Sequence, residues 1–165
     1  MLKCLIDDSF ADEGSSKWSE NAVIGYFAQN HSEEFKSNIS LIDWMAKWSH
    51  QEDDMETIRG TLGRLLFSQD DINKPVSVLS GGEQRRMLFG KIILQRANVI
   101  ILDEPTNHLD MESIESLNHA LNIFDGTTIF VSHDREFISS LATRLIEIKS
   151  DKIIEHSSYE NYQSS

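Results

Sequence analysis

Cysteine, proline and long apolar runs are scarce in this chain of 165 residues. It has one cysteine, Cys4, and two prolines, so no disulfide can form within the chain. No stretch approaches the ~20 consecutive apolar residues of a membrane-spanning helix, and residues 1–6 are too short for a secretory signal peptide. These absences favour a protein of the reducing cytoplasm that has no direct membrane contact.

Basic side chains are scarce too. The chain has 15 basic and 27 acidic residues, for a formal net charge of -12, which opposes non-specific attraction to a nucleic-acid backbone. Direct RNA or DNA binding by this segment alone is therefore disfavoured. The basic side chains that do cluster are expected on one helix and are candidates for an anion site or a solvated face: Arg85, Arg86, Lys91 and Arg96.

The sequence also lacks the loop Gly-x-x-x-x-Gly-Lys-Ser/Thr with which many nucleotide-binding proteins hold phosphate groups. Residues 14–17 read Gly-Ser-Ser-Lys, but the leading glycine is not at the required spacing and no helical pattern follows. Without the backbone N–H groups and lysine of such a loop, we expect no grip on the β- and γ-phosphates in these residues.

The apolar pattern that is present predicts one domain with an α/β core and a helical lobe. The core is expected in residues 1–30 and 75–165, and the lobe in residues 38–74, where apolar residues recur at helical spacing. Short apolar strands, expected to be buried on both faces, alternate with helices after Pro75, which predicts a parallel sheet with crossover helices. The expected strands are 21–28, 99–102 and 127–131, the expected helices 1–5, 82–95, 111–124 and 134–142, and a closing hairpin is expected at 144–149 and 152–156.

Two carboxylates follow the apolar strand 99–102. Asp103 and Glu104 are expected at the carboxyl edge of the sheet, where open α/β folds bind ligands. An Asp there suits Mg²⁺, and the next carboxylate can polarise a water that attacks a phosphate. The alternative is a helix start decorated with acids, which favour first turns.

Further polar residues accompany these carboxylates. Ser80-Gly81-Gly82 precedes a predicted helix, whose free N–H groups attract anions, although a plain turn and helix cap is the commoner use of such a triplet. His133 and Gln29 each follow a predicted strand. His133 can donate to a γ-phosphate, and Gln29 suits Mg²⁺ or the attacking water; the alternatives are a structural histidine and an exposed loop amide.

In their order along the chain, these motifs resemble those of the ABC ATPases. Leu79 to Gln84 looks like the signature motif, Val99 to Glu104 like the Walker B strand, Asn107 to Asp110 like the D-loop, His133 like the switch histidine and Gln29 like the Q-loop glutamine. The resemblance implies a partial P-loop NTPase fold of the ABC type that uses ATP and Mg²⁺. By the same resemblance, Glu104 and His133 are catalytic, Asp103 and Gln29 bind metal, and the nucleotide-binding residues are Gln29, Ser80, Gly81, Gly82, Glu83, Gln84 and Asp110.

The residues of two motifs resemble those of the ABC-F branch of this family. Residues 103–110 read Asp-Glu-Pro-Thr-Asn-His-Leu-Asp and residues 131–135 read Val-Ser-His-Asp-Arg. Members of that branch carry two nucleotide-binding domains in one chain and act on the ribosome. The chain most resembles the second domain, because no long charged insertion interrupts its helical lobe. Its tail, residues 158–162, is similar to the Gly-Asn-Tyr segment after such a domain, with serine in place of glycine.

The same resemblance implies a composite site, in which the signature of one domain completes the site on the P-loop of another. We therefore expect this chain to need a second ABC domain and to be inactive alone, since a homodimer would also lack the loop. Two alternatives stay open: a fragment of a transporter ATPase subunit, and a non-catalytic module that docks its signature face on a complete ATPase domain. An absent P-loop strand would also leave a sheet edge unpaired, which favours a dimer through that edge.

Overall fold

A computed structural model describes residues 2–7, 12–28, 31–107, 109–149 and 152–163. The chain divides into two compact units, residues 1–103 with 126–130, and residues 104–125 with 131–165. In chain order the elements are α1 (Leu2–Ile6), β1 (Ile24–Phe27), the 3-10 helix η2 (Ser32–Phe35), α2 (Leu41–Ala46), α3 (Met55–Arg64), the 3-10 helix η3 (Val76–Val78), α4 (Gly81–Leu94), β2 (Val99–Asp103), α5 (Met111–Asn122), β3 (Thr127–Val131), α6 (Arg135–Leu141), β4 (Leu145–Ile148), β5 (Ile153–His156) and α7 (Tyr159–Gln163).

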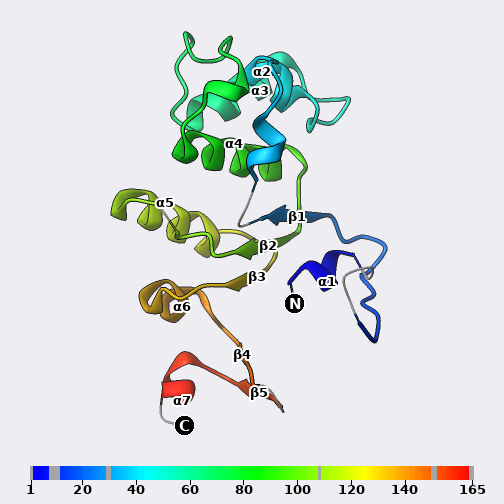
Figure 1. The fold of residues 1–165 in the computed structure, drawn as a ribbon, viewed down its shortest axis with the longest axis vertical. Coiled ribbons are helices and arrows are strands. Elements are labelled where there is room, and N and C mark those ends of the chain that lie inside the picture. Colours follow the sequence, from blue (N-terminus) through cyan, green and yellow to red (C-terminus); the bar gives the residue numbers. More distant parts are fainter. Residues whose placement is uncertain (1, 8–11, 29–30, 108, 150–151, 164–165) are drawn as a thin grey trace. The chain divides into compact units, whose positions relative to one another are not determined.

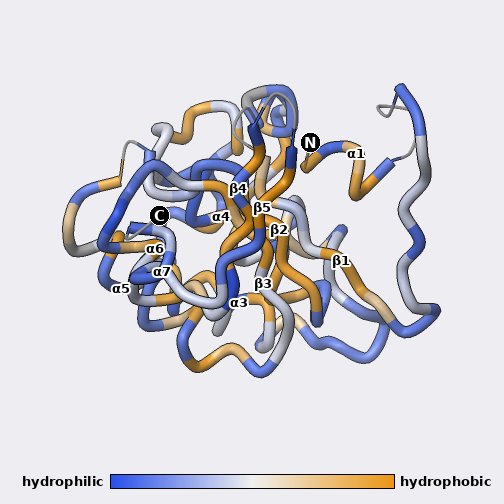
Figure 2. Tube along the Cα trace, turned by 90° about the horizontal axis from the view of Figure 1, so that it is seen from below, coloured by the Kyte–Doolittle hydropathy of each residue, from blue (hydrophilic) through white to orange (hydrophobic). Residues whose placement is uncertain are grey.

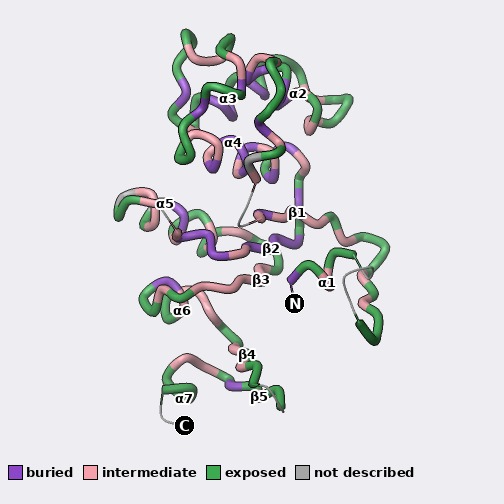
Figure 3. The backbone as a smooth tube through the Cα atoms, viewed as in Figure 1, coloured by how far each residue is buried: buried purple, intermediate pink, exposed green. Residues whose placement is uncertain are grey.

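The main sheet has the order β1-β2-β3. β1 and β2 are parallel, with Ile24 opposite Val99 and Phe27 opposite Leu102, and α5 is the crossover between β2 and β3. The predicted parallel sheet is confirmed for this pair. β2 is buried over its first four residues, as Figure 3 shows. The expectation of full burial is wrong for β3, which is only half-buried and begins with the exposed Thr127.

Helices α2, α3 and α4 pack together in the first unit (Figure 1). Each is preceded by a residue whose side chain accepts a backbone N–H of the first turn: Ser40, Asp54 and Ser80. Between them, Met45 and Leu62 are fully buried. The apolar faces of these helices are what the helical spacing of the sequence predicts.

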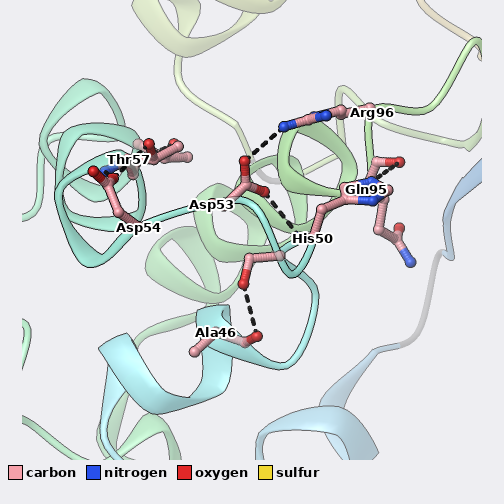
Figure 4. A network of polar contacts seen from close by, with 9 residues as sticks. Ala46, His50, Asp53, Asp54, Thr57, Gln95 and Arg96 are labelled. Atoms are coloured by element: carbon pink, nitrogen blue, oxygen red, sulfur yellow. Dashed lines mark hydrogen bonds and ion pairs between the residues drawn. The ribbon is translucent and has the colours of Figure 1, made fainter.

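A polar network joins the turn between α2 and α3 to the end of α4 (Figure 4). Asp53 accepts the backbone N–H of His50 at 2.9 Å and pairs with the Arg96 guanidinium at 2.7 Å. These contacts, the His50 N–H first, lower the pKa of Asp53. The expectation that Arg96 lies on the helix is wrong, because α4 ends at Leu94 and Arg96 has a left-handed φ of 51°. The network therefore fixes the chain just before it enters β2.

The second unit contains α5, α6, α7 and the hairpin of β4 and β5. β4 and β5 are antiparallel, with Leu145 opposite His156, so the predicted hairpin is confirmed. Both strands are rich in apolar residues (Figure 2), and Ile146, Ile148 and Ile153 are exposed. Within the described residues, no helix combines the length and the apolar character that crossing a membrane requires.

Candidate functional site

Glu104 stands directly after β2 in an unusual backbone conformation. Its φ is +51°, in the left-handed region that costs an ordinary residue about 1–2 kcal/mol. Its N–H donates to the carbonyl oxygen of Val131, the last residue of β3, at 2.9 Å. The residue is 8% exposed. Strain of this kind persists only where the surrounding contacts enforce it, and it gathers at functional sites.

His133 meets the Glu104 carboxylate with both its backbone and its side chain. The backbone N–H donates to Oε2 of Glu104 at 3.3 Å, and the ring Nε2 lies 3.2 Å from Oε1. The two residues are separated by 29 positions in the sequence, and the prediction that they share a sheet edge is confirmed. The His133 side chain is 93% exposed while that of Glu104 is 9% exposed. A buried carboxylate is therefore in contact with an accessible imidazole, and such a pair is suited to holding a water beside a phosphate.

Asp103 is the last residue of β2 and is half-buried. In the parallel pairing Tyr26 lies opposite Ile101, so Tyr26 and Asp103 occupy the same face of the sheet because side chains alternate. The Tyr26 hydroxyl is buried, and no hydrogen-bond partner for it is found among the described residues. Burial first, and then the charge of Asp103, raise the pKa of Tyr26. Sequence analysis missed this neighbour, although its spacing along the strand gave the signal.

The described residues contain no group of three or more histidine, cysteine, aspartate or glutamate side chains placed to hold a metal. Mg²⁺ is usually bound by one or two carboxylates together with water and substrate phosphates. Asp103, a carboxylate at the open end of a strand, fits that mode. Gln29, the other predicted metal and nucleotide ligand, lies outside the described residues.

The predicted signature motif forms the start of α4. Ser80 and Glu83 make a reciprocal capping box: Glu83 N–H donates to Ser80 Oγ at 3.4 Å, while the Ser80 N–H and hydroxyl each donate to Glu83 Oε2 at 2.7 Å. These bonds, the hydroxyl first, lower the pKa of Glu83. A Cβ added at Gly81 or Gly82 would meet nothing within 4 Å. The first turn of the helix is thus capped by its own side chains, and the space beside both glycines is open. The Gln84 side chain donates to the Leu79 carbonyl at 3.0 Å.

The basic residues that follow each have contacts of their own. Lys91 pairs with Glu34 at 2.7 Å and stands 4.0 Å above the Trp48 ring. The Arg86 guanidinium lies 5.1 Å from the centre of the Phe67 ring. The other two differ again: Arg85 is buried, and Arg96 belongs to the network with Asp53. These contacts show packing and ion pairing within the first unit, and the anion-site interpretation stays a prediction.

Asp110, predicted in the D-loop, is the cap of α5. Its Oδ1 accepts the backbone N–H of Ser113 at 2.8 Å. Between it and Glu104, the Asn107 N–H donates to the Glu104 carbonyl at 3.3 Å, so the segment turns sharply after β2. His108 of the same motif lies outside the described residues.

Comparisons with known proteins agree with these motifs. The family described as "ABC transporter" matches residues 3–107. The chain is 59% identical over 163 residues to the "Probable ATP-binding protein YbiT" of Escherichia coli O157:H7, covering 98% of this chain and 31% of that protein. It is 41% identical over 145 residues to the "ATP-binding cassette sub-family F member 3" of Rattus norvegicus, covering 88% of this chain and 20% of that protein. The chain thus spans less than a third of either relative.

Solved structures share the fold. The structure of a protein named "RNase-L Inhibitor" superposes with a TM-score of 0.69 at 22% identity, covering 93% of this chain and 31% of that one. A crystal structure of the complex of archaeal ribosomal stalk protein aP1 and archaeal ribosome recycling factor aABCE1 gives the same TM-score, identity and coverage. With the matching family extending over more than half of its length, and with relatives named in sub-family F, this chain belongs to the ABC transporter family of ATP-binding proteins.

Proposed function

We propose that this chain is part of an ABC-F type domain that hydrolyses ATP. The contact between Glu104 and His133, 3.2 Å across side chains that are 29 residues apart, carries this proposal. Glu104 would polarise the attacking water and His133 would donate to the γ-phosphate. Asp103 would hold Mg²⁺ together with Gln29, and the ion would supply positive charge to the phosphates.

The start of α4 would act on a nucleotide held by a second ABC domain. Ser80, Gly81 and Gly82 present the N-terminal end of a helix of 14 residues, where N–H groups and the helix dipole favour an anion. The open space before both glycines supports this role. Because the Ser80 hydroxyl now donates to Glu83, contact with a phosphate requires that hydroxyl to turn away from the carboxylate.

We further propose that the longer protein acts in translation, in the cytoplasm. The motif wording at residues 103–110 and 131–135 supports this, together with relatives named in sub-family F. The complex of a ribosomal stalk protein with a ribosome recycling factor contains another protein of the same fold. For this chain it indicates the kind of partner to test.

The 165 residues alone are expected to release no phosphate from ATP above background, because their sequence contains no P-loop motif. The test is to join to Met1 a segment that carries the P-loop motif. Steady phosphate release with Mg²⁺ and ATP is then measured for the chain and for the chimera. Hydrolysis by the chimera, lost in Glu104→Gln, is the expected result.

A matched variant controls for the charge change. Glu56→Gln removes one carboxylate from the exposed first turn of α3 and is expected to leave the rate of the chimera unchanged. Equal hydrolysis by the Glu104→Gln chimera and the unmodified chimera would contradict the role of Glu104. Steady release by the chain alone, abolished by Glu104→Gln, would contradict the need for the absent loop.

A further inference from the structure

Two hydroxyl groups join the loops that follow β2 and β3. The Thr106 Oγ1 lies 3.3 Å from the Ser132 Oγ, across 26 residues of sequence. Thr106 is 8% exposed and Ser132 is half-buried. Neither residue belongs to the predicted set of nucleotide, metal or catalytic residues, yet each lies within two positions of one of them.

The Ser132 hydroxyl sits at the centre of a short chain of hydrogen bonds. Its oxygen accepts the backbone N–H of Asp134 at 3.1 Å, and a hydroxyl still has one proton and one lone pair for another partner. Thr106 is placed to use that remaining capacity. Asp134 in turn caps α6 by accepting the N–H groups of Glu136 and Phe137. The loop after β2 is thereby connected to the first turn of α6.

The geometry of Glu104 and His133 depends on how these two loops lie against each other. Glu104 occupies a left-handed conformation, which neighbouring contacts must enforce. His133 has a side chain that is 93% exposed, so burial does not hold its ring in place. The backbone hydrogen bond from Glu104 to Val131 restrains the chain at Glu104. The hydroxyl contact between the loops restrains it two residues later, at Thr106.

We propose that Thr106 and Ser132 are positioning residues, whose hydroxyl pair keeps the His133 imidazole beside the Glu104 carboxylate. That this contact serves ATP hydrolysis rests on the proposed function. That the hydroxyl pair positions His133 is a statement about the chain without nucleotide and is tested on that chain, so a chimera that fails to hydrolyse ATP leaves this test intact.

The experiment is nuclear magnetic resonance on the isotope-labelled chain. Thr106→Val keeps the shape of the side chain and removes the hydroxyl, and Thr106→Ser keeps the hydroxyl. In Thr106→Val we expect the ring nitrogen shifts of His133 to change and its amide exchange to rise by about fivefold, the equilibrium effect of one ordinary hydrogen bond. Thr106→Ser is expected to restore both. Unchanged shifts and exchange in Thr106→Val overturn the proposal.

A second variant separates positioning from loss of folding. Ser132→Ala removes the shared partner, so the double variant with Thr106→Val should disturb His133 no more than Ser132→Ala alone, because contacting residues are not additive. Amide exchange at Leu117, buried in the second unit with these residues, reports the stability of that unit and should stay at the wild-type rate. Effects on His133 that simply add, or that match the change at Leu117, overturn the proposal.

Discussion

Two glutamates of this chain are held by different kinds of contact, one with a neighbour in the sequence and one with distant residues. Glu83 makes its contacts with Ser80, three residues earlier, in the first turn of α4. Glu104 makes its contacts with Val131 and His133, on another strand and loop, and does so from a left-handed backbone. The first geometry forms wherever that short segment folds into a helix. The second exists only when the sheet has formed, which is why it can couple distant chemical groups.

The largest expected difference between the two glutamates is in catalysis. In the chimera that carries the absent P-loop segment, Glu104→Gln should lower ATP hydrolysis by about 100-fold or more, the range for loss of a general base. Glu83→Gln should change the rate only a few-fold, because glutamine also completes a capping box. Single-turnover phosphate release measures both rates. Similar losses in the two variants would show that the comparison fails.

A second test uses the same pair of replacements at both positions. At Glu104, with φ of +51°, Glu104→Gly should be more stable than Glu104→Ala by about 1 kcal/mol, because glycine adopts the left-handed region freely. At Glu83, within α4, Glu83→Gly should be less stable than Glu83→Ala by about 0.5–1 kcal/mol. Urea unfolding of the four variants gives the two differences.

Comparing alanine with glycine cancels the lost side-chain contacts, which both replacements remove. The sign of each difference therefore reports the backbone alone. If glycine is the less stable residue at both positions, Glu104 does not occupy the left-handed region in solution. If glycine is the more stable residue at Glu83, that position does not lie within α4 in solution.

The sequence predicts best those features that depend on local contacts. The start of α4 is located by Ser80 and Glu83, and the run of β2 by four apolar residues, since caps and apolar runs are local signals. Trp48 follows Leu41 and Trp44 at helical spacing, but α2 ends at Ala46 and Trp48 packs under Lys91 from the following turn. Tertiary packing uses the same spacing as a helix, so spacing alone cannot separate them.

The sequence predicts which residues form the site better than it predicts how they are arranged. Glu104 and His133 are expected at one sheet edge because both follow strands, and their contact bears this out. The left-handed φ of Glu104 and the hydroxyl pair of Thr106 and Ser132 are not predicted. Both depend on how two loops meet, and no residue pattern within either loop specifies that meeting. The partial burial of β3 escapes prediction for a similar reason, since its apolar sequence reads like a buried strand.

A smaller effect is expected from the cap itself. Ser80→Ala removes the acceptor for the Glu83 N–H, and loss of such a cap costs about 1 kcal/mol of stability. Ser80→Asp should recover most of it, because aspartate is an equally good cap. Thermal unfolding of the three proteins measures the effect. A cost of several kcal/mol would mean that Ser80 also supports distant parts of the fold, which would remove the contrast with Glu104.

The smallest expected effect is the acid sensitivity of Glu83. Its pKa is lowered from 4.5, mainly by the Ser80 hydroxyl and N–H, so its ionised form stabilises the fold at pH above that ordinary value. This stabilisation is lost as the pH falls through the lowered value, because the folded state then binds a proton less readily than the unfolded one. Between about pH 6 and about pH 3, the urea midpoint of the wild type should fall further than that of Glu83→Gln. Glu56→Gln, which removes an exposed carboxylate at the start of α3, should keep the wild-type loss. Equal acid losses in the wild type and Glu83→Gln would mean that the capping box does not form in solution, and the local half of the comparison would lose its basis.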